Sequence, residues 1–274
     1  MTSQYETKRL ITFDRIKIKS NYKYLLNTKV KFNEMFHSRS GEKIGIFYSS
    51  KDDINIPYNL YIAVSYIKQT LTLEFSSKIL KEKYPDLISK DTIKECLTNI
   101  NQLNICDIDV DSILSNGAIT SVDVTYDANL ILSDNLLDAL NSQVNNYRRF
   151  KWAHYDKEGI MFTKDVKSKD CTETITLYNK EKEICTSHNK DFLNSLSQPQ
   201  SVIDYFKEKT RFEITLDTPK KIMKYLNLTD TKIFSVLNSD TKPILTQFDK
   251  VFGNSTANMP NITFNDYENW AMKI

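Results

Sequence analysis

The segment TETITLYNKEKE, Thr172 to Glu183, alternates apolar and polar side chains as a β-strand does. Because successive side chains of a strand point to opposite faces, Ile175 and Leu177 share one face. Tyr178 and Lys180 are expected on the other face, together with two threonines. A phenol and an ammonium group would therefore project from one polar surface.

The same asymmetry recurs in three other segments, each of which places an acid opposite its apolar side chains. They are LTLEF at 71–75 with Glu74, SVDVTYD at 121–127 with Asp123, and RFEITL at 211–216 with Glu213. If these strands lie in one sheet with residues 174–180, three carboxylates, a tyrosine and a lysine share a surface. A half-exposed antiparallel sheet also carries acids on its outer face for solubility alone, so a purely structural role stays open.

The order of the patterns predicts an α+β fold. Strand patterns fill 11–20, 43–50, 59–66, 69–77, 118–127, 149–155, 159–163 and 210–216, and helical patterns fill 90–100, 107–114, 133–144, 201–207 and 218–228. A central antiparallel β-sheet with helices packed on one face fits this order better than a βαβ repeat. We expect a single domain over residues 1–252, followed by a polar C-terminal arm over 253–274.

Composition excludes several classes of protein. The net charge of +2 argues against a polybasic DNA-binding protein, and five glycines without a Gly-rich phosphate loop argue against a P-loop nucleotidase. The four cysteines lack CxxC spacing, which favours reduced thiols in a cytosol. No apolar run reaches the length that a bilayer requires, and the polar N-terminus is unlike a secretory signal, so no membrane association is expected.

The residue types on the polar face suit phosphoryl transfer. Carboxylate oxygens are the ligands that Mg²⁺ or Mn²⁺ prefers, and such a metal polarises a phosphoryl oxygen. A tyrosine is a poor nucleophile at neutral pH because its reference pKa is about 10. A lysine close to Tyr178, with a metal, would favour the phenolate. Attack on a DNA phosphodiester would then leave a phosphotyrosine link and a free 3′-hydroxyl.

The order of four motifs resembles the replication initiators of the filamentous-phage gene II/X type. The motifs are LTLEFSSKIL, ITSVDVTYDA, TETITLYNKEKEI and TRFEITLDTPKKIMKYLNL, and the resemblance covers about residues 58–240. That family is related more distantly to plasmid rolling-circle initiators and to relaxases. It is also similar to the HUH endonucleases in having a central antiparallel sheet, so an HUH/Rep-like endonuclease domain is expected.

The resemblance implies a metal-dependent, site-specific DNA nickase and ligase that starts rolling-circle replication. Tyr178 would be the covalent nucleophile, and Lys180 would assist it or the scissile phosphate. Asp123 and Glu213 would be the main ligands of Mg²⁺ or Mn²⁺, with Glu74 as a weaker candidate. The expected partners are single-stranded or supercoiled origin DNA and, because no helicase motif is present, a host helicase in a bacterial cytoplasm.

The chain departs from this pattern in three places. The paired histidines of the HUH proteins are absent, since His37, His154 and His188 are isolated, so the metal site would be rich in carboxylates. Glu183 would be either a further ligand or an ion-pair partner. KEKYPD at 81–86 stands where relatives tend to have a Gly-Asn-like turn, and the C-terminal helical region of longer relatives is mostly missing.

A basic and aromatic segment, NNYRRFKWAHYDK at 145–157, suits single-stranded DNA, where bases stack on rings and phosphates meet cations. The predicted DNA contacts are Arg148, Arg149, Lys151 and Trp152, together with Arg211 of the Arg-Phe-Glu motif. The alternative is a β-hairpin that buries its aromatic side chains and exposes its charges.

Two other functions remain open at this point. A conjugative relaxase would use the same chemistry for another biological purpose. A catalytically silent DNA-binding or virion-associated protein would keep the fold but would have no reason to bring Tyr178, Asp123 and Glu213 to one point. The oligomeric state and the origin sequence are not encoded in any motif.

Overall fold

The computed structural model describes residues 11–138, 150–155, 158–164 and 174–248. These residues form two compact units. Unit 1 takes its described residues from Met1–Asp123, Asp191–Pro199 and Leu216–Thr241, and unit 2 takes its own from Val124–Lys190, Gln200–Thr215 and Lys242–Ile274. The expectation of one domain over 1–252 stays a prediction, and the arm at 253–274 lies outside the described residues.

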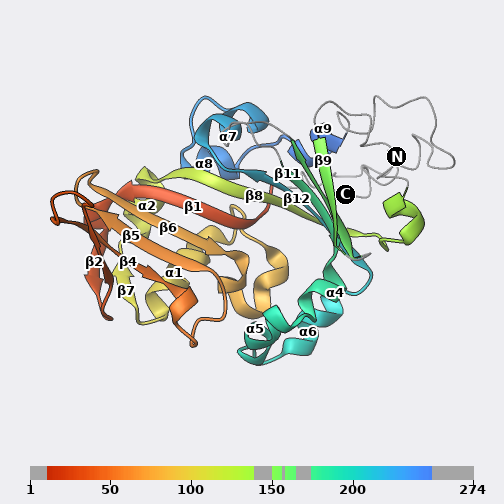
Figure 1. The fold of residues 1–274 in the computed structure, drawn as a ribbon, viewed down its shortest axis with the longest axis horizontal. Helices are drawn as coiled ribbons and strands as arrows, with labels where there is room; N and C mark the ends of the chain where they lie inside the picture. Colours follow the sequence, from red (N-terminus) through yellow and green to blue (C-terminus); the bar gives the residue numbers. More distant parts are fainter. Residues whose placement is uncertain (1–10, 139–149, 156–157, 165–173, 249–274) are drawn as a thin grey trace, which may run out of the picture. The chain divides into compact units, whose positions relative to one another are not determined.

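The sheet of unit 1 has the strand order β3-β4-β5-β6-β1-β8. The bounds are β1 Phe13–Asn21, β3 Asn33–Phe36, β4 Lys43–Ser49, β5 Leu60–Ser65, β6 Thr70–Ser76 and β8 Ala118–Asn129, of which the first part of β8 belongs to this unit (Figure 1). From β3 to β1 each strand pairs with the next in antiparallel fashion. This meander explains the alternation in the sequence, because one face is apolar and the other polar.

The core of unit 1 lies between the apolar face of this sheet and its helices. Ile16, Leu73 and Phe75 of the sheet are buried, as are Leu97 and Ile100 of α1. The remaining elements that fall wholly or mainly in this unit are η1 Tyr22–Tyr24, β2 Leu25–Thr28, η2 Ser50–Asp52, η3 Ser77–Asp86, α1 Ile93–Gln102, β7 Cys106–Ile108, α2 Val110–Asn116, α5 Lys190–Asn194, α7 Pro219–Leu226 and α8 Ile233–Leu237. Strands β2 and β7 form a separate small sheet.

Unit 2 continues the strand order as β8-β12-β11-β10-β9, with β9 Phe150–Tyr155, β10 Gly159–Lys164, β11 Thr174–Asn179 and β12 Lys209–Leu216. Strands β9, β10, β11 and β12 pair in antiparallel fashion. Its other elements are α4 Lys180–Ile184, η5 Ser187–Asn189, α6 Pro199–Tyr205 and α9 Pro243–Phe248. Phe162, Ile175 and Ile214 occupy one cross-strand row and are all buried, so this row anchors the core of the unit.

The prediction of an α+β fold with a large antiparallel sheet is confirmed. The helix expected from Ser133 is present over its described residues, where Ser133 Oγ accepts a hydrogen bond from the backbone N–H of Leu136 at 3.2 Å. None of the helices among the described residues is long and apolar enough to span a membrane.

Two local predictions are wrong: the range 107–114 expected to be helical begins in strand β7, and the strand that begins at Thr174 ends before Lys180. Asn179 caps helix α4, since its Oδ1 accepts from the backbone N–H of Lys182 at 2.9 Å. Glu181 and Glu183 in the first turn favour the helix start because they complement its dipole. Lys180 therefore leaves from the first turn of a helix and not from the polar face of the strand.

Candidate active site

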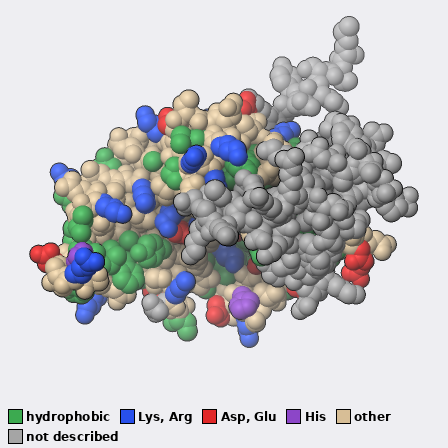
Figure 2. All heavy atoms as spheres, turned by 45° about the horizontal axis from the view of Figure 1, so that its top comes forward, with side chains coloured by type: hydrophobic (Ala, Val, Ile, Leu, Met, Phe, Trp, Pro, Cys, Tyr) green, Lys and Arg blue, Asp and Glu red, His purple; other side chains and the backbone are tan. Residues whose placement is uncertain are grey.

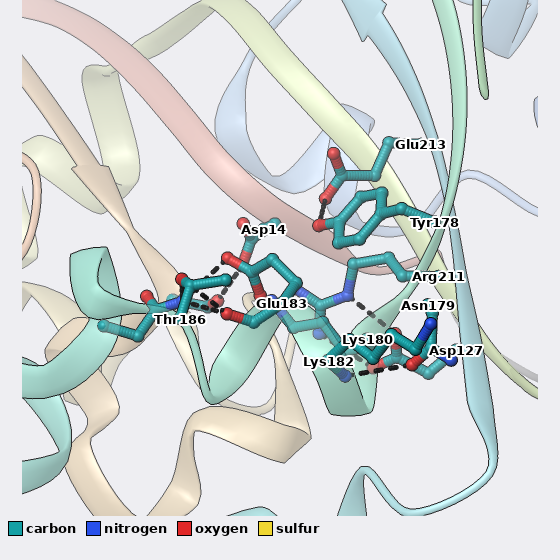
Figure 3. A network of polar contacts seen from close by, with 12 residues as sticks. Asp14, Asp127, Tyr178, Asn179, Lys180, Lys182, Glu183, Thr186, Arg211 and Glu213 are labelled. Carbon is teal, nitrogen blue, oxygen red and sulfur yellow. Dashed lines mark hydrogen bonds and ion pairs between the residues drawn. The ribbon is translucent and has the colours of Figure 1, made fainter. Parts of the chain in front are cut away.

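Tyr178 and Glu213 form the centre of the candidate site in unit 2. The Tyr178 hydroxyl donates a hydrogen bond to Glu213 Oε1 at 3.0 Å (Figure 3). Tyr178 pairs with Arg211 across β11 and β12, and Glu213 pairs with Thr176. The two side chains are thus diagonal neighbours on one face, within reach for long side chains. Both residues are half-buried, so the carboxylate can accept the phenol proton while the site stays accessible to a ligand.

A glycine next to the tyrosine fixes where its side chain lies. Gly159 opposes Tyr178 in the β10 and β11 pair. A Cβ atom at position 159 would lie 2.6 Å from Tyr178 Cβ and 2.6 Å from the carbonyl oxygen of Leu177. No larger residue fits without moving the tyrosine, so Gly159 determines the position of the phenol.

Lys180 lies beneath the tyrosine ring as a buried cation. Its side chain is only 1% exposed, and its Nζ lies 5.5 Å from the ring centroid of Tyr178 and 5.5 Å from that of Phe206. The same Nζ donates to Glu183 Oε2. Asn189 Nδ2 donates to Glu183 Oε1 at 2.9 Å and so orients this carboxylate. Of the two roles considered for Glu183, the structure shows the ion pair.

Arg211 is buried and lies opposite Tyr178 in the pairing of β11 with β12. Its Nε and Nη2 donate to Asp127 Oδ1 at 2.6 Å and Oδ2 at 2.8 Å, a bidentate pair in which the arginine has no exposed surface (Figure 3). Its guanidinium also lies 5.3 Å from the ring centroid of Phe206. This position does not support the predicted DNA contact at Arg211, because a fully buried and paired guanidinium cannot meet a phosphate at the surface.

The other two predicted carboxylates meet in unit 1, around an arginine. Arg15 Nε donates to Asp123 Oδ2 at 2.7 Å, and its Nη1 donates to Glu74 Oε1 at 2.9 Å. Lys17 Nζ forms a second ion pair with Glu74 Oε2 at 2.8 Å. Sequence reasoning missed Arg15, although the alternation of ITFDRIKIKS already places it on the polar face with Lys17.

The charges of this cluster stabilise one another. Burial alone lowers the pKa of Arg15, but the hydrogen bond and negative charge of Asp123, and then those of Glu74, raise it above its ordinary value. For Glu74, burial raises the pKa, but Lys17 and Arg15 together outweigh that effect and the pKa is lowered. Both groups are therefore charged at neutral pH.

The carboxylates do not assemble into a metal site within the described ranges of the chain. No group of three or more His, Cys, Asp or Glu side chains there could hold a metal ion. Asp123 and Glu74 already bind Arg15, and Glu213 accepts from Tyr178. Within the described residues the three predicted carboxylates are thus held by protein partners, and the Mg²⁺ or Mn²⁺ site stays a prediction.

The predicted DNA-binding segment is described only in part. Arg148 and Arg149 lie outside the described residues. Lys151 and Trp152 lie in β9, whose backbone pairs with Thr163 and Phe162 of β10. The four contacts stay predictions.

Comparison with protein families matches residues 87–235 to the family of the N-terminal region of the phage gene II replication-associated protein. No curated protein matches the chain. The matched range is more than half of the 274 residues and includes Asp123, Tyr178 and Glu213. The chain therefore belongs to this family of replication-associated proteins, the gene II-type replication initiators of phages.

Proposed function

We propose that this replication initiator nicks and rejoins DNA at an origin through a covalent 5′-phosphotyrosine at Tyr178. Membership of the family supports a role in phage replication and binding to origin DNA. The observation that carries the chemistry is the hydrogen bond from the Tyr178 hydroxyl to Glu213. A phenol held against a carboxylate on a half-buried sheet face has the arrangement of a nucleophile and its base.

In the proposed step, the Tyr178 oxygen attacks the phosphorus of a phosphodiester while Glu213 accepts the phenol proton. The bond from phosphorus to the 3′-oxygen breaks, and the proton passes from Glu213 to that oxygen, which leaves as a 3′-hydroxyl. The reverse sequence rejoins the strand. Every proton and bond is accounted for by these two side chains and the DNA.

The pKa difference between the two groups sets the timing of proton transfer. Reference values of about 10 for tyrosine and about 4.3 for glutamate make a free phenolate beside Glu213 unfavourable by roughly 8 kcal/mol. Transfer therefore accompanies the formation of the bond to phosphorus, as general base catalysis requires. The positive charge of Lys180 beneath the ring favours the anion that develops during attack.

Metal dependence remains a prediction, and no step of this mechanism is derived from a metal. The cofactor expected is Mg²⁺ or Mn²⁺. A host helicase is the proposed partner for strand separation, in a bacterial cytoplasm. Of the three residues whose meeting would argue against a silent protein, Tyr178 and Glu213 meet in unit 2, whereas Asp123 binds Arg15 in unit 1. The silent protein therefore stays a rival function, which the adduct test separates from a nickase. A relaxase with the same chemistry differs in its biological role and not in this geometry.

The test is adduct formation on a denaturing gel. Labelled single strands from the element's own origin are incubated with the full chain and Mn²⁺, Mg²⁺ or a chelator, for the wild type, Tyr178→Phe and a control, Tyr66→Phe. Tyr66 is 42% exposed in unit 1. We expect a covalent band with the wild type and the control, and none with Tyr178→Phe. Bound DNA without any adduct for every strand and metal would instead favour the silent protein.

A further inference from the structure

The polar face of the unit 1 sheet carries two aromatic rings in contact. Phe47 of β4 and Tyr61 of β5 have ring centroids 6.1 Å apart and planes inclined by 33°. Both side chains are half-buried, whereas their strand neighbours Tyr48 and Ile62 are buried on the opposite face. Both rings therefore lie on the partly exposed face of the sheet, where a flat ligand can contact them.

The strand register places two lysines in the same cross-strand rows as these rings. One cross-strand row contains Phe47, Ala63, Thr72 and Lys19, and the next contains Tyr61, Glu74 and Lys17. Because neighbouring strands lie about 4.8 Å apart, the backbone positions of Phe47 and Lys19 are roughly 14 Å apart. Those of Tyr61 and Lys17 are roughly 10 Å apart. The side chains between Phe47 and Lys19 are small, so nothing in that row stands above the sheet between the ring and the charge.

The face has a surplus of positive charge. Arg15, Lys17 and Lys19 lie on it with two acids, Glu74 and Asp123. Arg15 binds both acids, and Lys17, which is 34% exposed, shares Glu74 with it. Lys19 is exposed and has no ion pair among the residues that the structure describes. These three cations and two acids leave one net positive charge on the face, so an anion meets the exposed Lys19 and the partly exposed ammonium group of Lys17.

We propose that this face binds single-stranded DNA, with bases stacked on Phe47 and Tyr61 and phosphates bound by Lys17 and Lys19. Rings accept any base, and phosphates are identical along a strand, so the contact tolerates any sequence. A duplex keeps its bases stacked inside and cannot offer them to the rings. In Figure 2, apolar side chains and Lys or Arg side chains lie side by side on the described surface. The choice of DNA as the nucleic acid rests on the proposed function.

The test is a fluorescence anisotropy titration of dye-labelled oligothymidylate with the full chain. Phe47→Leu and Tyr61→Leu keep an apolar side chain but remove the stacking surface. Because stacking on an aromatic ring contributes about 1–3 kcal/mol per base, each variant should weaken binding by about 5-fold to 160-fold. The matched control is Phe234→Leu in α8, a 47% exposed aromatic away from this face, and its affinity should equal that of the wild type.

Salt dependence gives a second measurement that does not depend on core packing. Lys19→Gln should reduce the slope of log affinity against log salt by about 0.7, the value expected when one phosphate of a single strand is no longer neutralised. Lys94→Gln in α1 removes a charge elsewhere on the surface and should leave the slope unchanged. Tyr61→Phe keeps the ring and should retain affinity, which separates stacking from misfolding.

The outcomes distinguish this surface from the nicking chemistry. Wild-type affinity in both leucine variants, or equal affinity for a duplex of the same length, would overturn the surface proposal even if Tyr178 forms an adduct. Weakened binding in both variants supports the surface, even if the wild type forms no adduct with any origin strand.

Discussion

The Tyr178 hydroxyl donates its hydrogen to Glu213 Oε1 over 3.0 Å, between diagonal positions of two neighbouring strands. This contact makes Glu213 the direct partner of the tyrosine, although the sequence alone suggests a metal ligand. An amide at position 213 can still accept the hydrogen bond, but it is a far weaker base.

Glu213→Gln should slow adduct formation by about 10²–10⁴-fold, the usual contribution of a general base. Binding of the origin strand should stay close to that of the wild type, because the hydrogen bond to Tyr178 remains possible. Single-turnover cleavage with separately measured binding checks both statements. An unchanged cleavage rate would remove Glu213 from the mechanism.

Gly159→Ala should displace Tyr178, since the new methyl group would lie 2.6 Å from its Cβ. Overpacking of this kind costs about 1–3 kcal/mol of stability, and the adduct rate should fall further than stability alone explains. Gly41→Ala is the control: it has φ +71 but nothing within 4 Å, so it is strained without touching the site. Urea unfolding and cleavage measured on both variants separate strain from displacement.

Arg211→Met should destabilise the chain by about 3–5 kcal/mol, because it leaves the Asp127 carboxylate buried without its partner. Adding Asp127→Leu should recover much of that stability, since an apolar pair replaces the ion pair. Free energies of unfolding in urea for the two single variants and the double variant give the coupling. Additive effects would show that the pair is not coupled.

Stability should fall in acid in a way that depends on Glu74. Its pKa is lowered in the folded chain from an ordinary value of 4.5, so its contribution is fully present above that pH and is lost as pH falls through the folded pKa. Arg15 stays charged throughout, because its pKa is raised. Unfolding free energies of the wild type and Glu74→Gln should therefore differ at neutral pH and converge below pH 4.5. A constant difference across this range would contradict the assignment.

Lys81→Gly should stabilise the chain by roughly 1 kcal/mol, because Lys81 has φ 55 and ψ −118, a conformation that suits glycine and strains other residues. Lys81→Ala removes the same charge but keeps Cβ, so it should show no such gain. Thermal unfolding of the two variants tests the effect.

Local pattern predicted most strands of the large sheet, but it missed β2, β3 and β7, the last of which lies partly in the range 107–114 that the pattern predicts to be helical. The roles of Tyr178 and Glu213 stay predictions. Side-chain alternation depends only on the backbone of a single strand, so it can be read from neighbours in the sequence. The order of the four motifs further indicated the family, which the match over 87–235 confirms.

Partners across the sheet could not be predicted in this way. Arg15 forms an ion pair with Asp123, which is 108 residues away in the sequence, and Arg211 forms one with Asp127, which is 84 residues away. These pairs depend on strand order and register, which a period of two residues does not specify. The sequence by itself therefore determined how polar and apolar side chains alternate along each strand. Only the tertiary structure decided that Arg15 pairs with two of the acids, that Arg211 is buried, and that Glu213 binds the tyrosine.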